Sequence, residues 1–284
     1  MFTLEVTNEY DQTLSLTQNP AYSIKSISGL DPPEASINKT KLANSDGSEF
    51  NSAFLNDRQI IITMAIESPA EINRNNLYTY LKSKKKVKIH YKNGLRDVYA
   101  VGIIQKVDVS FFEKKEIAQI TIDCVNPYFL EEEDSSADIS AIQSLFEFPF
   151  EISEPIPFSE IEAAEPVQVV NKGNDQTGVI ITLTAYRHSV AGNISIKNLN
   201  NNMTFKINRG ISAGDQIVVD SIRGEKSLYY VSNGVRTNIL NSMDRTSQWI
   251  VLEPGTNRIV IEEAHSDEAE ITAEITFTPK YQGV

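Results

Sequence analysis

The sequence predicts a mainly β protein of two domains with one helix. Three observations indicate this class: short apolar runs cut by turn signals over residues 203–262, one helical stripe near residues 77–81, and an abrupt change of composition at residues 131–136. Short strands separated by turns are typical of antiparallel sheets, whereas a βαβ enzyme core alternates strands with helices. A chain of 284 residues is long enough for two domains of about 100–150 residues.

Turn dipeptides define the strands of the C-terminal half. Asn233-Gly234 accepts positive φ at both central positions of a type I′ hairpin turn, and Pro254-Gly255 suits a type II turn. Residues 179–183 alternate between apolar and polar positions. The run 271–277 predicts a half-buried strand that faces the core with Ile271, Ala273, Ile275 and Phe277. These patterns together predict an antiparallel β-sandwich.

The N-terminal half predicts a sheet domain over residues 1–130. Strands are expected at 2–6, 14–16, 22–27 and 59–66, and Asn93-Gly94 predicts a further hairpin between residues 87–91 and 98–104. Residues 107–112 and 116–124 predict the next strand pair. Residues 38–56 are polar, with Asp46-Gly47 at their centre, and are interpreted as a long mobile loop.

A helix is predicted over about residues 69–83. Ser68 and Glu71 have the spacing of a capping box, and Pro69 fits the first helical position. Lysines then cluster at the expected C-terminal end, where cations complement the helix dipole, at positions 82, 84, 85, 86 and 88. A solvated helix end is the favoured interpretation of this cluster, and a patch for an anionic partner is the alternative.

The acidic residues 131–145 predict a linker between the domains, and residues 146–284 predict the C-terminal domain. The segment after the acidic run holds four phenylalanines, which a flexible linker would not carry: Phe146, Phe148, Phe150 and Phe158. We therefore interpret this Phe-Pro segment as an extended stretch that lies against the second domain.

Composition excludes several classes of function. The formal net charge of −12 argues against a dedicated nucleic-acid binder, which would need a basic face. Cys124 is the only cysteine, so no intrachain disulfide can form, and its place at the end of an alternating run favours a core thiol over a nucleophile. The first residues alternate like a strand and do not resemble a signal peptide, and no apolar run reaches the ~20 residues of a membrane helix.

No catalytic, cofactor-binding or metal-binding residues are predicted. No two glycines have the G-x-G spacing of a nucleotide loop, and the stretch Asn44–Gly47 lacks the flanking carboxylates of a calcium loop. The three histidines are isolated from one another in the sequence: His90, His188 and His265. Trp249 is interpreted as a core residue, and one ring of Tyr229-Tyr230 is expected on each face of its strand.

Motifs along nearly the whole chain match the pattern of one protein family. In the N-terminal half the matching residues are Gly29-Leu30-Asp31-Pro32-Pro33, Asp46-Gly47, Asp57-Arg58 before Ile60-Ile61-Ile62, Asn73 to Leu81 with the hairpin to Tyr99, and Asn126-Pro127-Tyr128-Phe129. In the C-terminal half they are Phe148-Pro149-Phe150, Ile156-Pro157-Phe158-Ser159, Val169 to Asn174, Gly214-Asp215, Leu252 to Asn257 and Tyr281-Gln282-Gly283-Val284. Each motif is weak alone, but in this order they resemble the distal tail proteins (Dit) of siphophages.

The resemblance implies a structural, non-enzymatic protein of the virion tail tip, assembled in the cytoplasm of the host bacterium. Its N-terminal domain would form a homohexameric ring, either single or stacked on a second ring. Its C-terminal domain would be a galectin-like sandwich. The ring would join the tail tube protein to the tail-associated hub or lysin protein and to receptor-binding proteins, and DNA would pass through its lumen without specific binding. The net charge of −12 adds the separate hypothesis that this lumen is acidic and repels DNA. Residues 1–130 alone are expected to oligomerise.

The alternative is a carbohydrate-binding adhesin that contacts the host cell wall through the C-terminal sandwich. Exposed aromatic side chains would have to supply its sugar-binding surface. The sugar-binding motifs of galectins are missing around His188 and Trp249, which favours the structural role.

Overall fold

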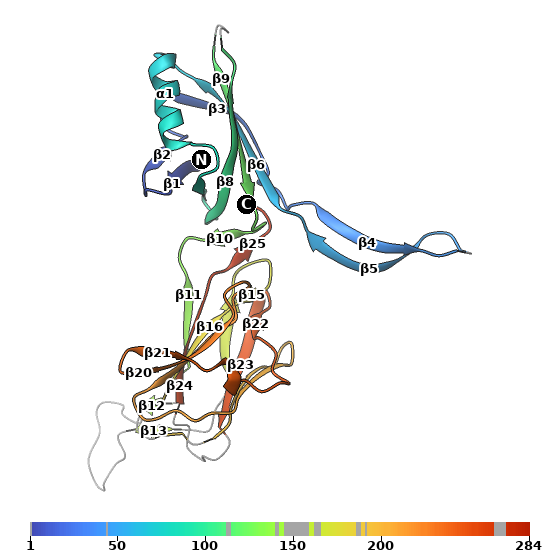
Figure 1. Ribbon diagram of the computed structural model, residues 1–284, viewed down its shortest axis with the longest axis vertical. Helices are drawn as coiled ribbons and strands as arrows, with labels where there is room; N and C mark the ends of the chain where they lie inside the picture. Colours follow the sequence, from blue (N-terminus) through green and yellow to red (C-terminus); the bar gives the residue numbers. More distant parts are fainter. Residues whose placement is uncertain are drawn as a thin grey trace. The chain divides into compact units, whose positions relative to one another are not determined.

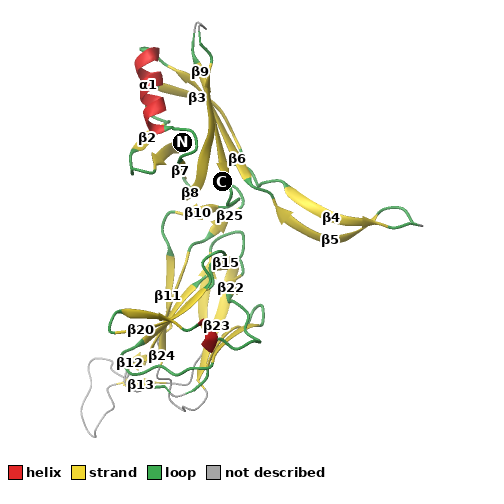
Figure 2. Cartoon of the chain, in the orientation of Figure 1, coloured by secondary structure: helices red, strands yellow, loops and turns green. Residues whose placement is uncertain are grey.

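The computed structural model describes residues 2–43, 45–111, 115–139, 142–144, 159–161, 166–185, 189–190, 192–263 and 271–284. The chain divides into two compact units (Figure 1). Unit 1 comprises residues 1–132 together with 280–284, and unit 2 comprises residues 133–279. Strands dominate both units (Figure 2), and the predicted mainly β class is confirmed.

Unit 1 is built on a nine-stranded sheet. Seven of its strands follow the order β2-β1-β7-β8-β9-β6-β3, while β10 pairs with β8 and β25 pairs with β10. All the pairs are antiparallel. The strands are β1 (Thr3–Asn8), β2 (Thr13–Ser15), β3 (Tyr22–Ser28), β6 (Arg58–Ile66), β7 (Lys86–Lys92), β8 (Asp97–Val109), β9 (Ile117–Cys124), β10 (Phe129–Glu131) and β25 (Lys280–Tyr281).

Alternation of side chains places the core of unit 1 on one face of this sheet. Leu4 and Val6 of β1, Ile60 and Ile62 of β6, and Ile122 of β9 are at most 1% exposed and belong to one apolar cluster. Their sequence neighbours point to the other face, because successive residues of a strand alternate. The strand predictions for this half are thus confirmed, with two exceptions. Residues 38–56 differ, and the separate strands expected at 98–104 and 107–112 are one strand, β8, with an irregularity between Ile104 and Lys106.

Helix α1 (Ala70–Tyr80) packs on this core through Leu77, which is fully buried. The helix is shorter than predicted, and Ser68 does not cap it. Pro69 stands at the N-cap in an extended conformation, no side chain caps the helix, and the first backbone bond runs from the Asn73 amide to the Pro69 carbonyl. The expected capping box was therefore wrong, because the chain turns into the helix one residue later.

The two Asn-Gly hairpins differ. Asn233 and Gly234 both have positive φ, 49° and 78°, and join β20 to β21 by the predicted two-residue turn. The loop between β7 and β8 instead spans residues 93–96, and the Asn93 side chain accepts hydrogen bonds from the amides of Leu95 and Arg96, both at 2.8 Å. The type I′ prediction at Asn93-Gly94 was therefore wrong, although the hairpin itself exists.

Unit 2 is an antiparallel sandwich of two sheets. The first has the strand order β11-β24-β16-β19-β20-β21 and the second β14-β23-β17-β18. Their bounds are β11 (Ser135–Ile139), β14 (Val167–Asn171), β16 (Ile180–Ala185), β17 (Ile194–Asn198), β18 (Met203–Ile207), β19 (Gln216–Asp220), β20 (Ser227–Ser232), β21 (Val235–Asn238), β23 (Gly255–Glu263) and β24 (Ile271–Phe277).

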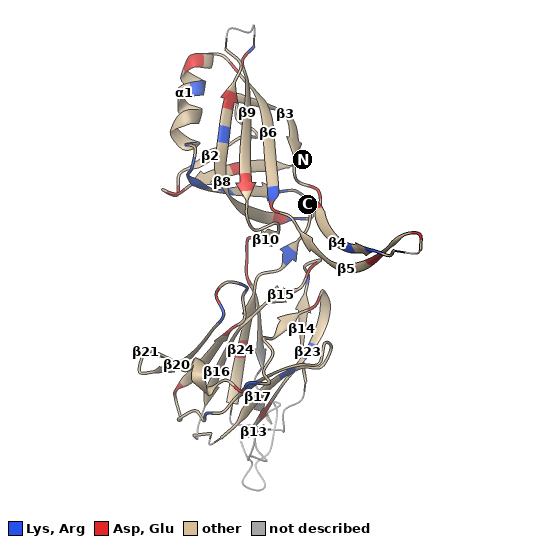
Figure 3. Ribbon diagram, turned by 45° about the vertical axis from the view of Figure 1, so that its right-hand side comes forward, with Lys and Arg blue, Asp and Glu red and all other residues tan. Residues whose placement is uncertain are grey.

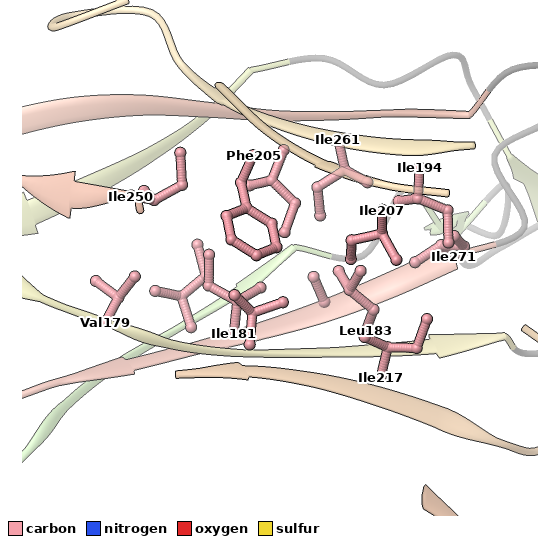
Figure 4. Close-up of a cluster of buried hydrophobic side chains, with 14 of the residues drawn as sticks. Val179, Ile181, Leu183, Ile194, Phe205, Ile207, Ile217, Ile250, Ile261 and Ile271 are labelled. Atoms are coloured by element: carbon pink, nitrogen blue, oxygen red, sulfur yellow. The ribbon is translucent and has the colours of Figure 1, made fainter. Parts of the chain in front are cut away.

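Inward side chains of both sheets form one core (Figure 4). Ile181 and Ile217 come from the first sheet, and Ile194, Phe205 and Ile207 from the second, and all five are fully buried. β24 has its apolar residues buried as the sequence predicts. Smaller elements complete the unit: β12 (Ile142–Ser144) with β13 (Ser159–Ile161), β15 (Thr177–Gly178) with β22 (Val251–Leu252), and the 3-10 helix η1 (Leu240–Ser242).

The unit boundaries differ from the expected linker at 131–145. β10 ends at Glu131 within unit 1, and β11 begins at Ser135 as an edge strand of unit 2, so this acidic stretch is largely strand. Charge alone did not reveal it, because edge strands tolerate polar side chains. Residues 280–284 also belong to unit 1. The Phe-Pro segment at 146–158 lies outside the described residues.

Candidate assembly surface

The segment interpreted as a mobile loop is a β-hairpin, which corrects that prediction. β4 (Ala35–Lys41) and β5 (Ser48–Leu55) pair only with each other, and Figure 1 shows that they extend away from the sheet of unit 1. We call this hairpin the arm. Nearly all of its residues are exposed. Periodicity failed to predict the arm because alternation reports burial, and the arm has no buried face.

The arm carries large apolar side chains into solvent. Phe50 is 65% exposed and Phe54 57%. They lie on opposite faces of the arm, because Phe54 pairs with Ser36 and Phe50 with Lys39 on either side of a register shift. Ile37, 60% exposed, lies on the same face as Phe50, because Ile37 and Lys39 are two residues apart on β4. Exposed apolar side chains gathered on one element indicate an interaction surface.

Cross-strand hydrogen bonds and one turn fix the arm. The Asn38 amide donates to Ser52 Oγ at 3.1 Å, and the Asn51 amide donates to Thr40 Oγ1 at 2.8 Å. Gly47 has φ of +94° at the tip. A two-stranded hairpin is marginally stable by itself in water, so this element gains most from a partner that covers it.

The outer face of β6 and β9 carries one charged residue, Asp123. The other residues of this face are Gln59, Ile61 and Thr63 on β6 and Ile117, Gln119 and Thr121 on β9, and the neighbouring strand β8 adds the ion pair of Lys106 with Asp108. Figure 3 shows only scattered acidic and basic positions on these strands. Amides and hydroxyls therefore set the chemistry of this face.

The lysine cluster lies beyond the helix, not on its last turn. α1 ends at Tyr80, and its last turn holds no basic residue. Lys85 instead forms an ion pair with Glu9 at 2.6 Å, and this hydrogen bond lowers the pKa of the Glu9 carboxyl. Lys88 pairs with Glu132 at 2.6 Å and lies 4.1 Å from the centre of the Tyr99 ring. The helix-end interpretation was thus wrong, and acidic side chains already engage part of the cluster.

Cys124 and His90, whose side chains could carry chemistry, instead make structural contacts. Cys124 is fully buried, as expected of a core thiol, and desolvation raises the pKa of its thiol to about 11. His90 contacts Asp97 at 2.5 Å, and Asp97 also pairs with Lys92 at 2.5 Å. The hydrogen bond from Lys92, more than that from His90, lowers the pKa of Asp97. His188 and His265 lie outside the described residues.

The aromatic residues of unit 2 mostly pack inward. Trp249 is half-buried and lies 5.0 Å, centre to centre, from the buried Phe205 ring, which confirms its assignment to the core. Tyr230 is 9% exposed and its hydroxyl donates to Asp215 at 2.7 Å, whereas Tyr229 lies on the other face of β20. The predicted division of this pair is confirmed.

The part of the chain that the structure describes has no cluster of three metal-binding side chains and no helix long and apolar enough to cross a membrane.

Sequence reasoning missed the buried polar residues that hold each unit together. Arg58 is 2% exposed in unit 1, and Asn171, Asn198 and Asn257 are at most 1% exposed in unit 2. A polar residue at an inward position of an apolar strand is the signal that would have found them.

Residues 172–281 match the family model of the siphovirus-type tail component, C-terminal domain. A search of curated proteins finds no match. The match covers most of unit 2, and it assigns this segment to the siphovirus-type tail components.

Solved structures are similar over the whole chain. The Dit protein (gp 19.1) of phage SPP1, described as a paradigm of the hub adsorption apparatus in phages that infect Gram-positive bacteria, has a TM-score of 0.70 at 16% identity, with 99% of each chain covered. Two structures of the phage P2 baseplate in its activated conformation, with calcium and with strontium, give TM-scores of 0.50 and 0.51 at 11% and 12% identity, with 100% of both chains covered.

The family match places residues 172–281 in one class, the siphovirus-type tail components, and the whole chain shares its mainly β fold with SPP1 Dit. Within that class the resemblance to siphophage distal tail proteins is confirmed, because the C-terminal segment matches the family model and the complete chain has the fold of SPP1 Dit.

Proposed function

We propose that this protein forms a closed homohexameric ring at the tail tip and connects the tail tube to the baseplate hub and receptor-binding proteins. The exposed arm of unit 1 carries large apolar side chains on both faces, Ile37 and Phe50 on one and Phe54 on the other, and this is the observation that carries the proposal. The fold adds support, because the similar chains belong to a hub and to a baseplate. The ring would assemble in the cytoplasm of the host bacterium, and it would carry out no catalysis.

A closed ring needs two different, complementary surfaces on each subunit, because its contacts are heterologous. The arm supplies one of them, since it extends from the sheet of its own unit and cannot cover its own phenylalanines (Figure 1). Burial of each phenylalanine against the next subunit would stabilise that contact by up to about 3 kcal/mol. The same contact would also give the marginal two-stranded hairpin the cover that it lacks.

The outer residues of β6 and β9 are compatible with DNA passing through the ring. The positions on β6 and β9 are mainly glutamine and threonine, with Asp123 as the charged member. Phosphates bind chiefly to lysine and arginine, so a lumen lined by this face would not retain DNA. It would be closer to neutral than the acidic lumen that the net charge of −12 suggests.

Sedimentation velocity of the full chain tests the ring. We expect a species of six times the 31.7 kDa monomer mass, and conversion to monomer when Phe50→Ser and Phe54→Ser are combined. The matched control is Leu95→Ser, which removes a side chain that is 93% exposed outside the arm and should leave the hexamer intact. A monomeric wild-type chain at every concentration, or a double variant that assembles like wild type, would contradict the proposal.

A further inference from the structure

The segment Lys280–Val284 completes unit 1 although it follows the whole of unit 2 in the chain. Its strand β25 pairs with β10, with Tyr281 opposite Phe129. Tyr281 is 2% exposed and belongs to the core cluster of unit 1, and the Arg96 guanidinium lies 3.9 Å from the centre of its ring. We call residues 280–284 the closing segment.

Buried Arg58 connects the closing segment to the rest of unit 1. Its Nε donates to the Pro127 carbonyl at 2.8 Å, its Nη1 to the carbonyls of Gly29 and Asp31, the latter at 2.8 Å, and its Nη2 to the Gln282 carbonyl at 2.5 Å. The guanidinium thus gathers three segments that are far apart in the sequence. A single arginine can do so because it has five donors in a rigid planar fork.

Close backbone contacts surround this guanidinium. Gly29 has φ of +86°, and a Cβ at that position would lie 2.0 Å from the Gln59 carbonyl oxygen. On the other side, the Val284 amide donates to the Leu30 carbonyl at 3.2 Å, and a Cβ on Gly283 would lie 3.1 Å from the Pro32 ring. The closing segment is therefore packed tightly against the loop that begins at Gly29.

Without the closing segment, Arg58 loses one of its carbonyl partners and the core loses Tyr281. A buried charge with an unsatisfied donor is costly, and so is the water-filled gap that an absent tyrosine side chain leaves. Unit 1 therefore cannot reach its final packing on residues 1–132 alone. This changes the expectation for a fragment of residues 1–130, which lacks the closing segment.

Chains are made from the N-terminus and their domains generally fold as units during synthesis. Here the closing segment is made only after all of residues 133–279. We propose that docking of residues 280–284 beside Arg58 is the step that completes unit 1, so that unit 1 becomes competent for assembly only once unit 2 has been made. This order withholds the arm-bearing unit from premature association. Only that consequence depends on the proposed ring, while the folding order stands on the contacts of Arg58.

Native-state amide exchange on a chain that ends at Pro279 tests the docking step without reference to ring assembly. Both the full chain and the truncated one carry Phe50→Ser and Phe54→Ser, so that assembly does not contribute to protection. We expect the amides of Ile60 and Ile122 in unit 1 to exchange at least about a hundredfold faster in the truncated chain, a change that reports the free energy of opening. The amide of Ile181 serves as the internal control in unit 2. Equal protection of unit 1 in the two chains would overturn the inference.

A relocated closing segment tests the order itself. In this variant a copy of residues 280–284 follows Glu131 through a two-residue turn, and the chain ends there, without unit 2. We expect the unit 1 amides to regain the protection that they have in the full chain, and the same variant with Tyr281→Ser in the copy to lack it. If the relocated segment restores no more protection than its Tyr281→Ser control, the closing segment does not complete unit 1 and the proposal fails.

Discussion

The two units satisfy their buried polar groups with different kinds of hydrogen-bond donor. In unit 1 one cation, Arg58, binds backbone carbonyls from segments as far apart as Gly29 and Gln282. In unit 2 neutral side chains do this, and they mainly fix turns. Asn257 donates to the carbonyls of Glu253 and Gly255 at 2.7 and 3.1 Å and accepts from the Glu253 amide at 3.0 Å.

Asn198 extends this network of unit 2 across the sheet. Its amide donates to the Val251 carbonyl at 2.9 Å and to Asn257 Oδ1 at 3.1 Å. Long-range contacts therefore occur in unit 2 as well, but neutral amides share them. Arg58 serves three separate segments, and a buried charge raises the cost of any missing partner. The comparison indicates that unit 1 concentrates its long-range polar contacts on one charged residue, whereas unit 2 divides them among neutral side chains.

Arg58→Met gives the largest expected effect. It leaves the carbonyls of Gly29, Asp31, Pro127 and Gln282 without their donor, and each buried unsatisfied group costs about 1–3 kcal/mol, so we expect unit 1 to lose about 3 kcal/mol or more of unfolding free energy. Amide exchange at Ile60, measured in increasing urea, gives this loss of unfolding free energy. Arg58→Lys should recover little, because one ammonium cannot reach all these carbonyls. Full stability of Arg58→Lys would show that the charge alone suffices.

Asn257→Ala tests the local network of unit 2. It leaves the Glu253 amide and two carbonyls unpaired, so we expect a loss of about 2 kcal/mol in unit 2 and no change in unit 1. Thermal unfolding followed by Trp249 fluorescence measures it, with the exposed Asn241→Ala as the matched control. A loss equal to that of Arg58→Met would remove the distinction between the two units.

The alkylation rate of Cys124 measures how well the core of unit 1 excludes solvent. Burial raises the pKa of its thiol from 9.0 to about 11, so at neutral pH the thiolate fraction falls about a hundredfold. We therefore expect alkylation at least about a hundredfold slower than at Leu95→Cys, an exposed site in the same unit, and faster alkylation in Arg58→Met. Alkylation of native Cys124 at the rate of the exposed thiol would contradict a closed core.

Asp244 gives the smallest effect, in unit 2. Hydrogen bonds from the Thr246 hydroxyl and amide, and from Asn208, lower the pKa of Asp244 from 3.8 to about 2. Because the folded pKa is depressed, the contribution of Asp244 is present above pH 3.8 and is lost as the pH falls towards 2. The melting temperatures of wild type and Asp244→Ala should differ slightly at pH 5 and converge near pH 2. A constant difference across this range would exclude the charge as its source.

The sequence predicts burial correctly for strands that are covered on one face. β24 and β16 show this in unit 2, and β6 shows it in unit 1, where the strand predictions are confirmed. The arm was misread because both of its faces are exposed, so its side chains carry no alternation. β11 was misread for a related reason, since its polar composition is that of an edge strand.

The amino-acid sequence by itself determined the mainly β class, the sandwich, the isolated core thiol and the resemblance to distal tail proteins, because alternation, turn dipeptides and motif order are local properties of the chain. Only the tertiary structure decided which distant segments meet. The positions of Gly29, Pro127 and Gln282 around Arg58 depend on strand pairing over as many as 224 residues, and no local pattern encodes a contact of that separation. The arm, likewise, became visible only when its strands were seen to pair with each other and with nothing else in unit 1.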